Sequence, residues 1–84
     1  MEENAVEELV ELLHTLAAAL VEDADTIEIE PEVDGNSVVL ELRVSEDDMG
    51  RVIGKGGRRA QAIRTIMKAR ASRLNCRVAV NIVD

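Results

Sequence analysis

Apolar side chains recur every three or four positions between residues 5 and 21, which is the spacing of one face of an α-helix. Acidic residues lead into this segment, where the positive end of a helix dipole favours them. The pattern therefore predicts a first amphipathic helix over 5–21. Its apolar stripe is Val6, Leu9, Val10, Leu13, Leu16, Ala17 and Leu20.

Three later segments place apolar residues at every second position, which predicts β-strands over 26–30, 37–44 and 77–83. The first is expected to end at Pro31, because proline interrupts a ladder of backbone hydrogen bonds. The sequence Asp34-Gly35-Asn36 is typical of a tight turn, so it should join the first two strands as a hairpin. The inward-facing residues are then Ile27, Ile29, Val38, Leu40, Leu42, Val44, Val78, Val80 and Ile82.

Two more helices are predicted between the second and third strands. Ser45 suits a helix N-cap, with Asp48 three residues later as in a capping box, and this short helix should run to about Ile53. Three glycines in residues 54–57 discourage its continuation. A longer helix is expected from Arg58 to about Leu74, with the apolar stripe Ala60, Ile63, Met67, Ala71 and Leu74.

The expected order is helix, strand, strand, helix, glycine loop, helix, strand. This order predicts one α+β domain over 1–84 with two layers, three helices covering one face of a three-stranded sheet. The first residues lack the basic and apolar regions of a signal peptide, and no apolar run reaches the roughly 18 residues of a membrane span. We therefore expect a cytoplasmic protein with no membrane partner.

Acidic and basic residues are segregated into different parts of the chain. Residues 1–49 carry 16 acids and one base, a net charge of −15, whereas residues 50–84 carry nine bases and one acid, a net charge of +8. The overall charge of −7 therefore hides a basic region that could bind phosphates. The alternative is a solvated helix face paired with the acidic half.

The glycine loop 54–57 is the strongest candidate for a binding site. Glycines let another backbone approach closely, and the following helix begins with unpaired N–H groups and a partial positive charge. Lys55, Arg58 and Arg59 add full charges there. The pattern thus indicates a phosphate-binding loop beside an apolar groove for bases, formed with part of the second strand. Val52, Ile53, Ala60 and Ile63 are either groove or core residues, and Ile53 and Ile63 are favoured as core.

Two other glycine-rich nucleotide-binding motifs are excluded by their spacing and position. A Walker A loop needs four residues between its glycines and a hydroxyl residue after the lysine, whereas three residues separate Gly50 from Gly54 and Gly56 follows Lys55. A dinucleotide fingerprint needs a preceding strand, but this loop joins two predicted helices. One cysteine and one histidine exclude an intramolecular disulfide and a zinc set, so no cofactor is expected. No enzyme is expected either, because no cluster in the sequence unites Cys76 or His14 with a carboxylate.

The run Val52-Ile53-Gly54-Lys55-Gly56-Gly57 resembles the VIGxxG signature of KH domains, whose GXXG loop clamps four nucleotides of a nucleic-acid backbone. The element order αββααβ is similar to that of the type II KH fold, with a mixed sheet. The whole chain resembles the small bacterial single-KH proteins of the KhpA family, through residues 48–58 and the acidic first helix. Gly56 departs from relatives that often carry a polar residue there.

The resemblance implies a single-stranded RNA-binding protein that acts as an RNA chaperone or post-transcriptional regulator. It implies homodimers and pairing with a larger KH protein. The expected RNA contacts are the loop Gly54, Lys55, Gly56 and Gly57, the cations Arg51, Arg58 and Arg59, and the apolar Val52 and Ile53. Because the chain has no aromatic residue on which bases could stack, one copy should bind weakly. The alternative is a KH-fold dimerisation or docking module whose nucleic-acid binding is weak or lost.

Overall fold

A computed structural model describes residues 1–83 of the chain. Its principal elements are α1 (Ala5–Ala18), β1 (Glu28–Asp34), β2 (Ser37–Arg43), α2 (Glu46–Ile53), α3 (Arg58–Arg73) and β3 (Arg77–Val83). Two single-turn 3₁₀ segments, η1 (Ala24–Thr26) and η2 (Lys55–Gly57), precede β1 and α3. The predicted αββααβ order is confirmed.

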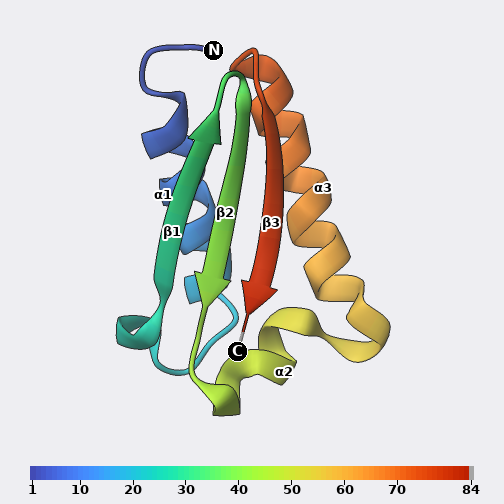
Figure 1. Cartoon of the computed structure of the whole chain (residues 1–84). Helices are drawn as coiled ribbons and strands as arrows, with labels where there is room; N and C mark the ends of the chain where they lie inside the picture. Colours follow the sequence, from blue (N-terminus) through green and yellow to red (C-terminus); the bar gives the residue numbers. More distant parts are fainter. Residues whose placement is uncertain (84) are drawn as a thin grey trace.

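The three strands form a mixed sheet in the order β1-β2-β3. Strands β1 and β2 are antiparallel and β2 and β3 are parallel. Helices α1 and α3 lie on one side of the sheet, and α2 lies near the ends of β2 and β3, packed against α3 (Figure 1). The fold is the two-layer α+β arrangement of a type II KH domain, with its sheet open on the opposite face.

The core lies between the sheet and the helices, as the alternating and helical patterns predict. Its largest fully buried side chains come from four elements, so burial joins the two layers. They are Leu9, Leu13, Val38, Leu40, Leu42, Val52 and Met67. No helix within residues 1–83 has the length and apolar character needed to cross a membrane.

Three boundaries differ from those predicted. Helix α1 ends at Ala18 rather than near residue 21, and the chain leaves it through a turn in which the Leu20 and Val21 N–H groups both donate to the Ala17 carbonyl. Strand β1 begins at Glu28 rather than at Thr26, which belongs to η1. It does not end at Pro31 but continues to Asp34, with Pro31 opposite Leu40. Because β1 is an edge strand, a residue without an N–H can be accommodated there.

The Ile53 side chain also differs from expectation. It is 37% exposed at the end of α2, so its prediction as a core residue is wrong, whereas Ile63 is 4% exposed and is confirmed as core. Helix α2 is short and turns its buried side toward α3 through Val52. The residue that follows Val52 is therefore rotated away from that contact.

Candidate functional site

The glycine loop is a single tight turn between α2 and α3. Gly54 ends α2, with its N–H donating to the Gly50 carbonyl at 2.9 Å, and the Gly57 N–H donates back to the Gly54 carbonyl at 3.1 Å. Gly54, Gly56 and Gly57 have φ angles of +76°, +65° and +74°. Residues with a β-carbon rarely adopt these angles, so the loop favours glycine at all three positions.

Gly54 is constrained by its surroundings as well as by its backbone angle. A β-carbon added there would lie 2.7 Å from Arg59 Cγ, 2.9 Å from Arg59 Cβ and 3.0 Å from the Arg59 backbone nitrogen. A β-carbon at Gly56 or Gly57 would meet no atom within 4 Å. Gly54 thus packs the loop against α3, while Gly56 and Gly57 leave open space in which another molecule can approach.

The beginning of α3 is electropositive. Its N-cap, Gly57, provides no capping side chain, and the first turn contains no acidic residue, so no carboxylate there offsets the helix dipole. Lys55 and Arg58 are exposed at this point and form no ion pair with any of residues 1–83. Backbone N–H groups and two free cations together form a site suited to a phosphate group.

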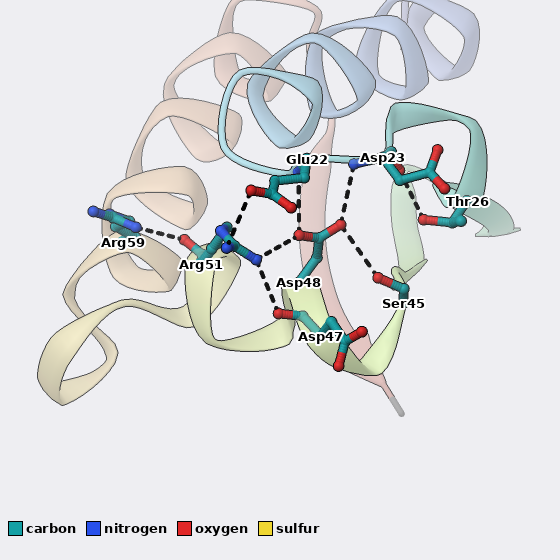
Figure 2. Close-up of polar contacts among 8 residues, drawn as sticks. All are labelled: Glu22, Asp23, Thr26, Ser45, Asp47, Asp48, Arg51 and Arg59. Atoms are coloured by element: carbon teal, nitrogen blue, oxygen red, sulfur yellow. Dashed lines mark hydrogen bonds and ion pairs between the residues drawn. The ribbon is translucent and has the colours of Figure 1, made fainter.

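Arg51 and Arg59, also predicted as phosphate contacts, have partners within the protein (Figure 2). Arg51 Nη1 donates to Asp48 Oδ1 at 2.9 Å and to the Asp47 carbonyl at 3.1 Å, and its Nη2 lies 3.5 Å from Glu22 Oε1. Arg59 Nη1 donates to the Arg51 carbonyl at 2.9 Å. Arg59 therefore connects α3 to the last turns of α2, across the base of the loop.

Asp48 is the centre of this network. The residue is 2% exposed, and its carboxylate accepts hydrogen bonds from the Glu22 N–H, the Asp23 N–H, Ser45 Oγ and Arg51 Nη1. The bond from the Glu22 N–H is the main cause that lowers the pKa of Asp48; burial opposes it, and the other three bonds lower the pKa further. The predicted capping box is wrong, because Asp48 turns toward the segment after α1 and holds it against α2.

A pair of variants tests the role of Arg59. Arg59→Met should lower the free energy of unfolding by about 1 kcal/mol, because it removes a hydrogen bond to the Arg51 carbonyl while retaining an aliphatic chain over Gly54. Arg58→Met, which removes the same charge from the neighbouring position, should change it by less than about 0.5 kcal/mol. Urea unfolding followed by far-ultraviolet circular dichroism measures both. Equal losses would show that Arg59 does not brace the loop.

The groove lies elsewhere than predicted. Val52, Ala60 and Ile63 are at most 4% exposed, and β2 is the central strand of the sheet, so these residues are core rather than groove lining. A hollow of about 240 Å³ instead follows the seam between α3 and the edge strand β3. It is lined by Arg64, Lys68, Val78, Ala79, Val80 and Asn81.

Arg64 and Lys68 belong to the basic region of residues 50–84 but were not among the predicted loop and groove residues, although their spacing of four places both on one face of a helix. Arg64 Nε donates to the Val80 carbonyl at 3.2 Å, so it reaches across the seam to the open edge of the sheet. A strand's open edge presents backbone donors and acceptors, and Arg64 shows that this edge is accessible to a polar group. The hollow therefore offers hydrogen bonds as well as aliphatic surface.

Among residues 1–83 no group of three or more His, Cys, Asp and Glu side chains is placed to hold a metal ion.

Solved structures with this fold include two of Era. One, titled as Era in complex with MgGDPNP and nucleotides 1506–1542 of 16S ribosomal RNA, matches 88% of this chain with a TM-score of 0.62 and 20% identity. The other, a single-residue variant of Aquifex aeolicus Era bound to GDP.AlF4-, matches 98% with a TM-score of 0.64 and 18% identity. This chain spans 28% and 31% of those Era chains, and at these identities the likeness shows the fold alone.

Comparison of the sequence with known proteins identifies the family as well as the fold. Two proteins named RNA-binding protein KhpA, from Caldanaerobacter subterraneus subsp. tengcongensis and Clostridium acetobutylicum, are 50% and 47% identical to this chain. Each match covers 87% of this chain and 97% of the relative. The model of the KhpA/KhpB KH domain matches residues 10–82, which include the glycine loop and nearly all of every strand. The chain therefore belongs to the KhpA/KhpB KH-domain family.

Proposed function

We propose that this chain is a non-enzymatic, single-domain protein that binds single-stranded RNA through the glycine loop. The observation that carries the proposal is the loop itself. Three glycines with positive φ stand at the uncapped start of α3, and Lys55 and Arg58 beside them have no partner within residues 1–83. The relatives' name, RNA-binding protein KhpA, supports RNA as the ligand.

In this proposal the RNA phosphates bind at the loop. The backbone of Gly54, Lys55, Gly56 and Gly57 approaches the sugar-phosphate chain, and Lys55 and Arg58 contribute charge. Arg51 and Arg59 act mainly by holding the loop in shape, because their guanidinium groups are bound to α2 and to the segment after α1. Val52 supports the loop from the core, as its side chain is fully buried.

The bases bind along the α3–β3 seam. The aliphatic contacts come from Ile53, which is exposed at the end of α2, and from Ala79 on β3. Hydrogen bonds come from the open edge of β3 and from Arg64. Stacking on aromatic side chains contributes about 1–3 kcal/mol per base in other single-strand binders. Without aromatic residues, one copy of this chain should therefore bind RNA weakly and with loose sequence preference.

Fluorescence anisotropy of short labelled single-stranded RNAs tests the proposal. The wild type should bind with a slope of log affinity against log salt of about −2, which corresponds to roughly three phosphate contacts. The double variant Lys55→Asp, Gly56→Asp places two carboxylates in the loop and should abolish binding while circular dichroism shows it folded. Equal binding by wild type and folded variant would refute the loop as the RNA site.

One structural observation favours a second function, docking of a protein partner. The side chains of Glu28, Glu30 and Glu32 alternate along β1 on the open face of the sheet, and Glu30 lies directly opposite Glu41 on β2. Like charges in directly opposite positions are unfavourable, and Arg43, whose Nη2 lies 3.8 Å from Glu41 Oε1, offsets only part of this negative charge. A KH fold that serves for docking, with weak or lost RNA binding, would account for this acidic face. This function is indicated if the Lys55→Asp, Gly56→Asp variant binds RNA as well as the wild type does.

We further propose that the protein acts in the cytoplasm as an RNA chaperone or post-transcriptional regulator. We also propose that it forms homodimers and that it pairs with a larger KH protein. The description of the family as KhpA/KhpB supports a second family member as partner. Dimerisation would offset the weak binding of one copy, because once one protomer has bound an RNA, its partner binds the same RNA at a high effective concentration.

Analytical ultracentrifugation tests the homodimer and should give about twice the monomer mass of 9.2 kDa. A monomer mass at high micromolar concentration would contradict the homodimer.

A further inference from the structure

A second, larger hollow lies at the opposite end of α3 from the glycine loop. Its volume is about 710 Å³, and it is bounded by the last turns of α3, the beginning of β3 and the β1–β2 turn. Figure 1 shows these three segments side by side at one end of the molecule, away from α2. The hydrogen-bonding side chains that line it are Asn36, Ser37, Lys68, Ser72, Asn75 and Arg77.

The lining of this hollow suits an anion. Lys68 and Arg77 are exposed cations that form no ion pair with any of residues 1–83, and no lining residue is acidic. Ser37 and Ser72 have hydroxyl groups and Asn36 has an amide group that can donate to phosphate oxygens. Glu2 reaches the rim, where Asn75 Nδ2 donates to Glu2 Oε1 at 2.8 Å. The centre of the hollow remains positively charged.

The two hollows are parts of one seam. Lys68 and Val78 line both of them. With a rise of about 1.5 Å per residue, Lys68 lies about 17 Å along α3 from Gly57, and Ser72 about 22 Å. A strand held at the glycine loop that follows the α3–β3 seam therefore arrives at the second hollow. The GXXG clamp of a KH domain holds four nucleotides. The strand therefore reaches the second hollow at the end of the clamped segment or beyond it.

A free anion would bind this hollow poorly. The end of α3 carries the negative pole of the helix dipole, which opposes the two cations. A phosphate that belongs to a strand already held at the loop is different, because its local concentration is high. The geometry thus favours a phosphate of a longer nucleic-acid strand over a separate small ligand.

We propose that the RNA strand continues beyond the clamp along α3 and β3, and that Lys68 and Arg77 bind one of its phosphates in the second hollow. This inference rests on the proposed function and extends its footprint beyond the four nucleotides of the clamp. Lys68 contacts this phosphate from the side where the two hollows meet, and Arg77 contacts it from the far end of the second hollow.

RNAs of about four and about eight nucleotides, with the same base composition, test the inference by fluorescence anisotropy. Arg77→Ala and Lys68→Ala should each weaken binding of the longer RNA about three- to tenfold, and Arg77→Ala should leave the shorter RNA unaffected. The salt slope for the longer RNA should become shallower by about 0.7 in each variant, as one single-strand phosphate contact is lost. Arg73→Ala is the matched control, because Arg73 is exposed at the same end of α3 but does not line the hollow.

The outcomes separate the two claims. If the longer RNA requires an intact glycine loop but Lys68→Ala and Arg77→Ala behave like Arg73→Ala, the second phosphate site is refuted and the loop function stands. If the longer RNA binds the Lys55→Asp, Gly56→Asp variant as well as it binds the wild type, both are refuted. Circular dichroism checks that each variant is folded, and since Lys68, Arg73 and Arg77 are all exposed, none should unfold the domain.

Discussion

Gly54→Ala is expected to lower the free energy of unfolding by about 2–5 kcal/mol and to weaken RNA binding at least tenfold. Gly54 has φ +76° and ψ 173°, a backbone conformation that essentially only glycine adopts and that costs a residue with a β-carbon about 1–3 kcal/mol. At φ +76° the new β-carbon would also lie 2.9 Å from Arg59 Cβ and 3.0 Å from the Arg59 backbone nitrogen, so α3 itself must shift. Overpacking of this kind typically costs a further 1–3 kcal/mol, taken as about 1–2 here because the loop is open on its other side.

Gly50→Ala is the matched control, four residues earlier. Gly50 lies within α2, its φ is not positive, and a β-carbon there would meet no atom within 4 Å. Alanine is favoured over glycine inside a helix by about 1 kcal/mol, so Gly50→Ala should stabilise the protein. Urea unfolding followed by circular dichroism compares the two. A Gly54→Ala protein as stable as the wild type would show that the loop does not depend on the conformation described for it.

Asp48→Asn should cause the second large effect, a fall in the melting temperature of about 10 °C. The Asp48 carboxylate accepts four hydrogen bonds, from the backbone of Glu22 and Asp23 and from Ser45 and Arg51. An amide has one accepting oxygen, and its NH₂ group would face donors, leaving buried polar groups without partners. Thermal unfolding of Asp47→Asn is the control, because Asp47 occupies the same helical turn but is exposed. Equal melting temperatures for the two variants would contradict the central role of Asp48.

The same carboxylate should make stability depend on pH. The pKa of Asp48 in the folded protein is lowered from its ordinary value of 3.8, so the unfolded chain binds the proton more readily. The stabilising contribution is therefore fully present above the unfolded pKa and is lost as the pH falls from about 4 through the folded pKa. Wild type and Asp48→Asn should differ in stability at about pH 6, and the difference should shrink as the pH falls below about 4. Parallel pH profiles would contradict this assignment.

Much of the fold could be predicted from the sequence because its patterns are local and regular. Alternation over 37–44 and 77–83 identified the buried residues of β2 and β3, and the glycines between two helical patterns located the loop. Pro31 was misjudged because the effect of a proline depends on whether its strand lies at the edge of a sheet. That position is a property of strand order, which no local pattern contains.

The candidate site was only partly predictable for a related reason. The identity of Arg51, Arg58 and Arg59 showed that charge gathers near the loop, but the sequence did not reveal which guanidinium groups have partners within the protein. Arg51 is bound by Asp48, whose carboxylate is directed by the segment after α1, 26 residues away in the chain at Glu22. The groove was misplaced onto β2 because the pairing of β3 with β2 leaves β3 as the edge.

The most direct test of the account is a titration of isotopically labelled protein with short single-stranded RNA, followed by nuclear magnetic resonance of the backbone amides. The largest shifts are predicted in residues 54–58 and along the α3–β3 seam, including Arg64 and Ala79. Shifts confined to the acidic face of the sheet, around Glu30 and Glu41, or no shifts at high micromolar RNA, would contradict the central claim that the glycine loop holds the RNA.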